Sequence, residues 1–470
     1  MQKLPSLRVY GPMTSLVHRS MMRVAVPLRF RLMDEIRSRE RWTLEQIKAY
    51  QDAKLRQLIE HCWRYVPYYR SRWSRHISAP SDIRTVEDLQ QLPVLTKDDL
   101  RDNLRALTSM APFLKSQPAR SGGSTGRPTI FRVTHLDQEY AWAQMYTGWS
   151  WAGWTPGQPF QIVGGESIGV GMTDNRTWRD RLMNRWITSG SNLTVERTRV
   201  LARSAHFDRI RVIYGYPNAI RELCELLRVI GARPKALRGV VCTAEVMRKE
   251  VREDIESALG VPVHDQYGLN DGGLFAVEGP DRDGLHFFFH RAVLEILDDE
   301  NRVVNDPMKA GRAIATNLIN FATPFVRYET GDMIHWQTLA ASASGITWPR
   351  IGQVDGRTGD VIYLPSGRRI AMPGLTLVMR WIDGLRQYQF IQTGPAAVTV
   401  RLDRGPDLRM SEEDVLGYLR QKISHEIEWS ILWAPPEMTQ NHKILIIRND
   451  WMRARRSRGE SAAADVGISS

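Results

Sequence analysis

The feature of this sequence that most limits its fold is an alternation of strand and helix patterns between residues 161 and 268. Short stretches rich in β-branched and apolar residues predict strands at 161–164 and 261–268, a strand with the turn that follows it at 209–217, and a strand with the loop that follows it at 237–245. Amphipathic stretches between the later strands predict helices at 218–230 and 247–259. Such alternation predicts a mostly parallel sheet, with ligands bound at the carboxyl ends of its strands.

The remainder of the chain predicts a second, smaller domain. At 470 residues the chain is too long for one compact core. We expect an α/β protein whose large N-terminal domain, over 1–356, combines mostly parallel sheets with a β-rich subdomain that begins near residue 285. A small mobile α+β domain is expected over 357–450, and an Arg-, Ser- and Ala-rich tail over 451–470 is expected to be disordered.

The composition limits the binding partners and the compartment that can be expected. A formal net charge of +12 favours anionic partners such as nucleotides, coenzyme A or anionic lipid, and no nucleic-acid-binding motif is present. Cys62, Cys224 and Cys242 are widely spaced and fit neither a disulfide framework nor a zinc site, which predicts a reducing compartment, the cytoplasm. No apolar run reaches the length of a membrane span, and arginines interrupt the apolar residues of the N-terminus, unlike a signal peptide.

One N-terminal segment leaves two interpretations open. Residues 19–33 are basic and apolar enough to lie on a membrane surface, so weak peripheral contact is one of them. Pro27 interrupts the segment, which favours packing against the body of the protein. The tryptophans in and after a helix expected at 136–152 also have two interpretations, an aromatic pocket or, preferably, core packing. They are Trp142, Trp149, Trp151 and Trp154.

A glycine-rich stretch at 120–129, Arg-Ser-Gly-Gly-Ser-Thr-Gly-Arg-Pro-Thr, indicates a phosphate-binding loop. Glycines let backbone N–H groups converge on an anion, and hydroxyls add donors without bulk. The stretch lacks the spacing of a Walker loop, and a strand rather than a helix is expected to follow it at 130–133. A surface turn is the alternative interpretation of this stretch.

Further polar motifs follow this loop in a fixed order. They are Tyr267-Gly-Leu-Asn-Asp271, Arg327-Tyr-Glu-Thr-Gly-Asp332, Gly356-Arg357 and a lone Lys443 after a Gln-Asn-His turn. Each motif alone is weak to moderate, but together in this order they resemble the acyl-adenylate-forming superfamily. Within it the chain is most similar to the phenylacetate–CoA ligase-like branch, which includes capsule-biosynthesis proteins. Supporting motifs are Val66-Pro-Tyr-Tyr-Arg70, Leu92-Pro-Val-Leu-Thr-Lys97, Tyr214-Gly-Tyr-Pro217 and Tyr388-Gln-Phe-Ile-Gln392.

The resemblance implies a binding site for ATP. Tyr267, with Gly268 beside it, would stack on adenine, and Asp332 and Arg357 would hold the ribose. The residues implied to wrap the β- and γ-phosphates are Ser121, Gly122, Gly123, Ser124, Thr125, Gly126 and Arg127. Those implied to flank the adenine are Thr243, Ala244 and Glu245.

The resemblance also implies the catalytic groups. Asp271 stands where the family carries a glutamate for Mg²⁺. Lys443 corresponds to the lysine that bridges the carboxylate and the α-phosphate during adenylation, where it stabilises developing charge. The hinge of the family falls at Gly359 or Asp360. Departures from the family pattern are Asn270, the shorter Asp271, and Asn441-His442 before the lysine.

The function implied is that of an AMP-forming acid–thiol ligase. The enzyme would use ATP and Mg²⁺ to convert a carboxylic acid, with an aryl acid suggested by the aromatic density, into an acyl-AMP that reacts with coenzyme A. An alternative keeps the adenylation but passes the acyl group to an amine, a glycan or lipid hydroxyl or a carrier thiol. A third hypothesis, motivated by the departures above, is a degenerate, non-enzymatic member that binds nucleotide or acts as a scaffold in a polysaccharide pathway. The oligomeric state expected is a monomer or a homodimer.

Overall fold

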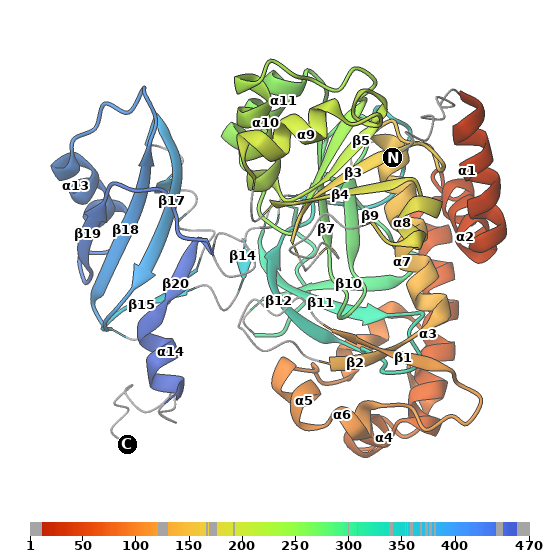
Figure 1. The fold of residues 1–470 in the computed structure, drawn as a ribbon. Helices are drawn as coiled ribbons and strands as arrows, with labels where there is room; N and C mark the ends of the chain where they lie inside the picture. The colour runs from red at the N-terminus through yellow and green to blue at the C-terminus, as the bar shows by residue number, and fades with distance from the viewer. Residues whose placement is uncertain are drawn as a thin grey trace. The chain divides into compact units, whose positions relative to one another are not determined.

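The fold was determined from a computed structural model of the chain (Figure 1). The structure describes residues 12–120, 130–165, 168, 176–190, 193–298, 300–307, 309–337, 342–352, 354, 356–357, 361–366, 369–371, 375, 378–379, 382–438 and 445–457. The chain divides into two compact units. The large unit comprises Met1–Thr330 and His335–Gln353, and the small unit comprises Gly331–Ile334 and Val354–Ser470.

An eight-stranded sheet organises the large unit. In spatial order its strands are β13 (Arg350–Ile351), β9 (Leu285–Phe287), β8 (Phe275–Glu278), β7 (Val263–Gly268), β6 (Gly239–Thr243), β5 (Val212–Gly215), β3 (Phe160–Gly164) and β4 (Arg185–Ser189). The five strands from β4 to β7 are parallel, and those from β7 to β13 are antiparallel. The predicted β-rich region therefore contributes β9 to the same sheet as the parallel strands.

The helices that join the parallel strands are α8 (Trp178–Leu182), α9 (Val195–Arg203), the 3₁₀ helix η5 (Phe207–Arg209), α10 (Pro217–Val229) and α11 (Lys249–Leu259), and α7 (His135–Trp151) precedes β3. Ile220, Leu223 and Leu227 recur at helical spacing in α10 and are buried against the sheet. Trp149 and Trp154 are fully buried, which confirms core packing for these two tryptophans.

The N-terminal helices show how Pro27 divides the basic segment. Pro27 begins α2 (Pro27–Ser38) and separates it from α1 (Pro12–Ala25). The side of α2 that carries Phe30 and Ile36 is buried, and α2 packs on α7, so packing against the body is confirmed for this part. The helices that follow are α3 (Leu44–Tyr65), α4 (Pro67–Trp73), η1 (Pro80–Asp82), η2 (Val86–Gln91), α5 (Lys97–Asp102) and α6 (Leu104–Leu107).

Two smaller sheets lie wholly or partly in the large unit. The strands β1 (Ser116–Arg120) and β2 (Ile130–Thr134) form an antiparallel hairpin. A four-stranded sheet has the order β10 (Ala292–Leu297), β11 (Gly311–Asn317), β12 (Tyr328–Ile334) and β14 (Gly356–Arg357). Because the unit boundary falls after Thr330, β12 begins in the large unit and ends in the small one.

The small unit is an α+β arrangement. Its four-stranded sheet has the order β19 (Glu428–Leu432), β18 (Ala397–Arg404), β17 (Leu385–Gln392) and β20 (Ile447–Asn449). A second pair consists of β15 (Val361–Tyr363) and β16 (Arg369–Ala371), and the helices are α13 (Glu412–Lys422) and α14 (Asp450–Ser457).

The C-terminal residues differ from expectation. Disorder is predicted from residue 451, whereas α14 covers this region as far as Ser457. The Asn449 carboxamide oxygen accepts a hydrogen bond from the backbone N–H of Met452 at 2.8 Å, and the Met452 side chain is buried, so both a cap and packing hold the helix. Among the described helices, none is long and apolar enough to cross a membrane.

Candidate active site

The carboxyl ends of β5, β6 and β7 bring three predicted segments together. The register pairs Gly215 of β5 with Cys242 of β6, and Thr243 of β6 with Gln266 of β7. The strand ends therefore form one edge, as the predicted parallel sheet requires. Tyr267 lies at this edge on β7, half-buried, and Gly268 ends the strand, exposed.

A glutamine that sequence analysis missed connects these three strands. Gln266 is buried, and its Nε2 donates to Tyr214 Oη at 3.3 Å and lies 3.5 Å from Thr243 Oγ1. Burial raises the pKa of Tyr214 to about 12, so its hydroxyl keeps its proton. Gln266 Oε1 has no hydrogen-bond partner among the described residues. A buried acceptor of this kind suits a ligand N–H, for which the amino group of adenine is one example.

The turn after β6 holds the other residues predicted to flank adenine. Ala244 has a φ of +69°, in the left-handed region that residues with a Cβ rarely adopt. Glu245 follows, and its carboxylate accepts a hydrogen bond from Asn218 Nδ2 at 2.8 Å, which ties the turn to the first turn of α10. The backbone conformation of the turn is thus held by a contact with a neighbouring element.

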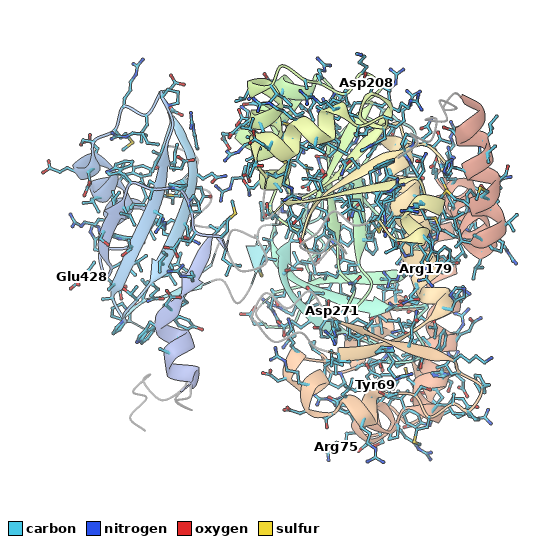
Figure 2. All side chains as sticks on the ribbon, viewed as in Figure 1. Tyr69, Arg75, Arg179, Asp208, Asp271 and Glu428 are labelled. Carbon is cyan, nitrogen blue, oxygen red and sulfur yellow. The ribbon has the colours of Figure 1, made fainter. Side chains whose placement is uncertain are left out.

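Asp271 lies in the loop between β7 and β8 and is buried (Figure 2). Its Oδ2 accepts a hydrogen bond from the hydroxyl of Tyr328 at 3.0 Å. Gly272 and Gly273 follow with positive φ, and a Cβ on Gly272 would lie 2.7 Å from the Cβ of Ala315, so this loop requires glycine. A fixed carboxylate fits a Mg²⁺ ligand, since this ion prefers oxygen donors.

The glycine-rich loop connects the two strands of a hairpin. Its stems are β1 and β2, with Arg120 paired to Ile130, so the predicted strand after the loop is confirmed. Arg132 fixes the stems, since its guanidinium donates to Ser116 Oγ at 2.8 Å and its backbone N–H donates to Thr323 Oγ1 at 3.0 Å. The implied phosphate ligands Ser121, Gly122, Gly123, Ser124, Thr125, Gly126 and Arg127 lie outside the described residues.

The small unit contains the remaining predicted residues. Asp332 of β12 is the register partner of Arg357 of β14, and the Asp332 side chain is buried. The pairing brings together the two backbone positions implied to hold ribose. Lys443 and the hinge candidates Gly359 and Asp360 lie outside the described residues.

Comparison with known proteins reveals similar sequences. No model of a known protein family matches the chain. The phenylacetate-coenzyme A ligase of Thermus thermophilus is 27% identical over 333 residues, which cover 68% of this chain and 72% of the relative. That of Escherichia coli is 28% identical over 331 residues, with 68% and 74% covered. Protein CapK of Staphylococcus aureus is 22% identical over 315 residues, with 66% and 68% covered.

A solved structure with a similar fold is that of a 2-hydroxyisobutyryl-CoA ligase in the postadenylation state, in complex with R3-HIB-AMP. The TM-score is 0.67 at 18% sequence identity, with 90% of this chain and 94% of the other covered. The same ligase in complex with 2-HIB-AMP and CoA, in its thioesterification state, gives a TM-score of 0.55. The likeness extends over nearly the whole chain and confirms the predicted α/β fold class.

Proposed function

We infer that this chain is an acyl-adenylate-forming ligase of the phenylacetate–CoA ligase-like branch, and that it activates a carboxylic acid with ATP and transfers the acyl group to coenzyme A. The observation that carries this conclusion is the similarity to phenylacetate-coenzyme A ligases from several organisms, each over about two thirds of the chain. The predicted resemblance to that branch is thereby confirmed.

The first half-reaction forms a mixed anhydride. A carboxylate oxygen of the acid attacks the α-phosphorus of ATP, the bond to the β-phosphate breaks, and pyrophosphate leaves. We assign the adenine to the edge formed by Tyr267, Thr243 and Gln266, whose unpaired Oε1 is available to an N–H of the base. We assign the β- and γ-phosphates to the glycine-rich loop, whose stems Arg132 holds.

Three further residues complete the proposed adenylation machinery. Mg²⁺, when bound, would neutralise charge on the phosphates, and Asp271 is the residue assigned to hold it. Tyr328 would position the Asp271 carboxylate through their 3.0 Å hydrogen bond. Lys443 would donate to the carboxylate and α-phosphate oxygens, where negative charge concentrates in the transition state.

The second half-reaction transfers the acyl group. The thiolate of coenzyme A attacks the carbonyl carbon of the acyl-AMP, the thioester forms, and AMP leaves. Asp332 and Arg357 are assigned to the ribose of this AMP, and a movement about Gly359 or Asp360 is proposed between the two half-reactions. The three cysteines are all free and buried, which fits a reducing compartment, and we propose the cytoplasm.

ATP–pyrophosphate exchange tests the proposal. We expect exchange with an acid panel that starts from phenylacetate, followed by AMP release that depends on coenzyme A. Lys443→Ala should lower exchange at least 100-fold, because a group that stabilises only the transition state is removed. Lys422→Ala, an exposed lysine of the same unit at the end of α13, is the matched control and should change exchange less than twofold.

Other outcomes separate the alternatives. Exchange without AMP release on addition of coenzyme A would identify a different acceptor, such as an amine, a hydroxyl or a carrier thiol. Binding of ATP without exchange, across the whole panel, would contradict the enzymatic proposal and support a nucleotide-binding protein. Unchanged exchange in Lys443→Ala would remove this lysine from the chemistry.

A further inference from the structure

A glutamine in the small unit contacts the chain on both sides of Lys443. Gln389 lies in β17, within the Tyr388-Gln-Phe-Ile-Gln392 motif, to which the proposed function assigns no role. Its Nε2 donates to the backbone carbonyl oxygen of Glu437 at 3.2 Å and to that of Leu445 at 2.9 Å. Its Oε1 accepts a hydrogen bond from the backbone N–H of Glu437 at 3.0 Å. One side chain therefore joins the two ends of the segment that contains Lys443.

The three contacts of Gln389 match the chemistry of a carboxamide. Its nitrogen carries two hydrogens for two carbonyl oxygens, and its oxygen accepts from one N–H. Because the side chain is 1% exposed, water cannot replace these hydrogen bonds when the carboxamide is removed. A carboxylate of the same length could not donate to the two carbonyl oxygens. The position therefore requires a glutamine for the two ends to be held together.

Neighbouring contacts attach the same two ends to the sheet of the small unit. The backbone N–H of Phe390 donates to the carbonyl oxygen of Ile446 at 2.7 Å, and Phe390 is the parallel register partner of Ile447 in β20. At the other end, the carboxylate of Glu437 accepts a hydrogen bond from Arg401 of β18 at 2.7 Å. Both ends are thus fixed to β17 and β18, the two central strands of this sheet.

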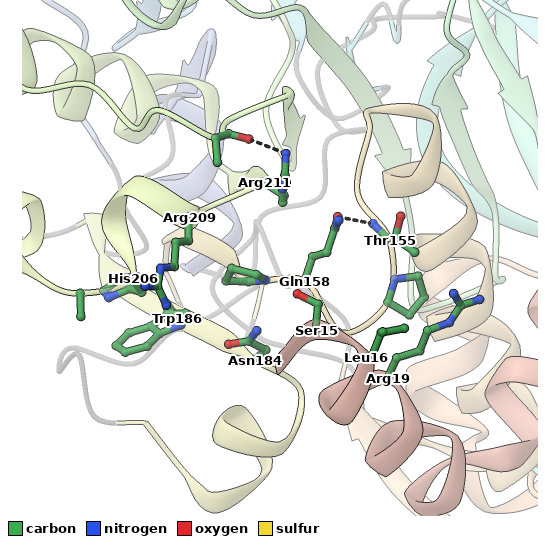
Figure 3. Close-up of a pocket in the computed structure, with 14 residues that line it drawn as sticks. Ser15, Leu16, Arg19, Thr155, Gln158, Asn184, Trp186, His206, Arg209 and Arg211 are labelled. Atoms are coloured by element: carbon green, nitrogen blue, oxygen red, sulfur yellow. Dashed lines mark hydrogen bonds between the residues drawn. The ribbon is translucent and has the colours of Figure 1, made fainter. Parts of the chain in front are cut away.

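A glutamine in the large unit shows a simpler form of this contact. Gln158 Oε1 accepts a hydrogen bond from the backbone N–H of Thr155 at 2.9 Å, in a turn that lines a cavity (Figure 3). That turn is also closed by its backbone, since the N–H of Gln158 donates to the carbonyl oxygen of Thr155 at 3.0 Å. Seven residues lie between Glu437 and Leu445. A longer connection has more conformations to exclude, so fixing both of its ends matters more there.

We propose that Gln389 is a positioning residue for the adenylation half-reaction: by holding both ends of the segment 438–444, it determines where the ammonium group of Lys443 can reach. This inference rests on the proposed function, in which Lys443 stabilises charge in the transition state of adenylation. Such stabilisation depends on a charged group that is in place before the reaction, and it falls steeply when that group is displaced. Lys443 has no assigned role in the transfer to coenzyme A, so Gln389 should affect the first half-reaction alone.

Separate assays of the two half-reactions test this role on the full-length protein. Gln389→Met keeps a side chain of similar length and removes its hydrogen-bonding groups. ATP–pyrophosphate exchange should fall about tenfold or more in this variant. Release of AMP from coenzyme A and synthetic acyl-AMP, made from the acid that supports exchange, should change less than about twofold. A merely structural role would lower both rates together, and that result would overturn the proposal.

Gln392→Met is the matched control. Gln392 belongs to the same strand and is fully buried, but its carboxamide bonds elsewhere. Its Oε1 accepts from the backbone N–H of Tyr363 at 2.9 Å, and its Nε2 donates to the carbonyl oxygen of Tyr363 at 2.8 Å. Thermal melting should show similar destabilisation of both variants, while Gln392→Met keeps exchange within about threefold of wild type. An equal loss of exchange in both variants would identify a packing defect in β17 as the cause and would overturn the proposal.

A double variant tests whether Gln389 acts through the lysine. Exchange in Gln389→Met/Lys443→Ala should stay within about twofold of that in Lys443→Ala, because positioning has no effect once the ammonium group is absent. A further loss of about tenfold in the double variant would mean that Gln389 acts independently of Lys443, contrary to the proposal.

Limited proteolysis provides a measure that does not depend on activity. Trypsin cleaves after lysine, so Lys443 reports on its own segment. Cleavage after Lys443, followed by mass spectrometry, should be about fivefold faster or more in Gln389→Met than in wild type and Gln392→Met. Unchanged cleavage would overturn the anchoring by Gln389. Faster cleavage together with a wild type that shows no exchange would support the anchoring and contradict the proposed function, so the two proposals fail independently.

Discussion

The large unit contains ion pairs that are more deeply buried than the pairs around Glu437 in the small unit. In the large unit several ion pairs are withdrawn from water, with both partners at most 8% exposed. They are Arg29–Glu139, Arg291–Asp137 and Arg327–Glu295. In the small unit Glu437 pairs with Arg401 and Arg448, but its own side chain is 44% exposed. The first arrangement fixes elements in place, whereas the second is screened by solvent.

The buried pair of Asp137 and Arg291 joins elements that frame the candidate site. Asp137 belongs to the first turn of α7 and accepts two hydrogen bonds of 2.8 Å from Arg291, and Asn317 of β11 donates to the same carboxylate. This network connects α7, which follows the stem β2 of the glycine-rich loop, to the sheet that contains β12. The large unit thus uses its buried charges to fix the framework of the candidate site.

The largest effect is expected from breaking that network. Asp137→Ala leaves Arg291 buried without its carboxylate, so the free energy of unfolding should fall by about 3–5 kcal/mol. Urea unfolding followed by tryptophan fluorescence measures it. Asp137→Asn, which retains an acceptor oxygen, should cost less than the alanine variant. A loss below about 1 kcal/mol in Asp137→Ala would show that the large unit does not depend on its buried pairs.

An intermediate effect is expected from a buried carboxyl inside the large sheet. Burial, with Glu278 nearby, raises the pKa of Asp265 to about 7. Folded Asp265 therefore keeps its proton while the unfolded residue loses it, so its contribution to stability is present at low pH and lost as pH rises towards 7. The free energy of unfolding of Asp265→Asn, measured relative to that of wild type, should therefore be higher at pH 8 than at pH 5 by on the order of 2 kcal/mol.

Urea unfolding of both proteins at the two pH values measures this change. Buried histidines with lowered pKa values make stability rise with pH, which is opposite to the effect of Asp265. Their contribution is the same in variant and wild type, so it cancels in the difference between the two proteins. An equal difference at pH 5 and pH 8 would mean that Asp265 does not titrate in this range.

The smallest effect is expected from the exposed pairs of the small unit. Glu437→Gln removes the partner of Arg401 and Arg448, but its half-exposed position should limit the loss to less than about 1 kcal/mol. Raising the salt concentration should shrink the loss further, because ions screen exposed charges. A loss as large as that of Asp137→Ala would erase the contrast between the units.

Sequence patterns predicted the strands that have two neighbours in the parallel sheet and missed several at sheet edges. β3, β5 and β6 are apolar and buried on both faces, so their composition identifies them. The missed strands β1, β4 and β19 lie at the ends of their sheets, whereas β8, which the patterns also missed, is an interior strand of only four residues. Edge strands need fewer apolar residues, and Pro118 within β1 is tolerated for this reason.

The candidate site shows a similar limit. Tyr267 and Asp271 belong to a local motif, and such motifs are visible in the sequence alone. Gln266 and Tyr328 acquire their roles from partners far along the chain: Gln266 from Tyr214, 52 residues away, and Tyr328 from Asp271, 57 residues away. Those contacts depend on strand register and on the packing of a second sheet, which no local pattern encodes.

The path of the chain between the units has a practical consequence for dissecting the protein. The chain passes from the large unit into the small unit at Gly331 and returns to the large unit at His335. It enters the small unit a second time at Val354. Proteolytic nicking at the last junction would release a C-terminal piece that lacks the 331–334 segment of β12, while the N-terminal piece would retain Asp332 without its strand partner Arg357. Neither cleavage product would be a complete unit, and complementation between the two pieces is the appropriate assay for a split form.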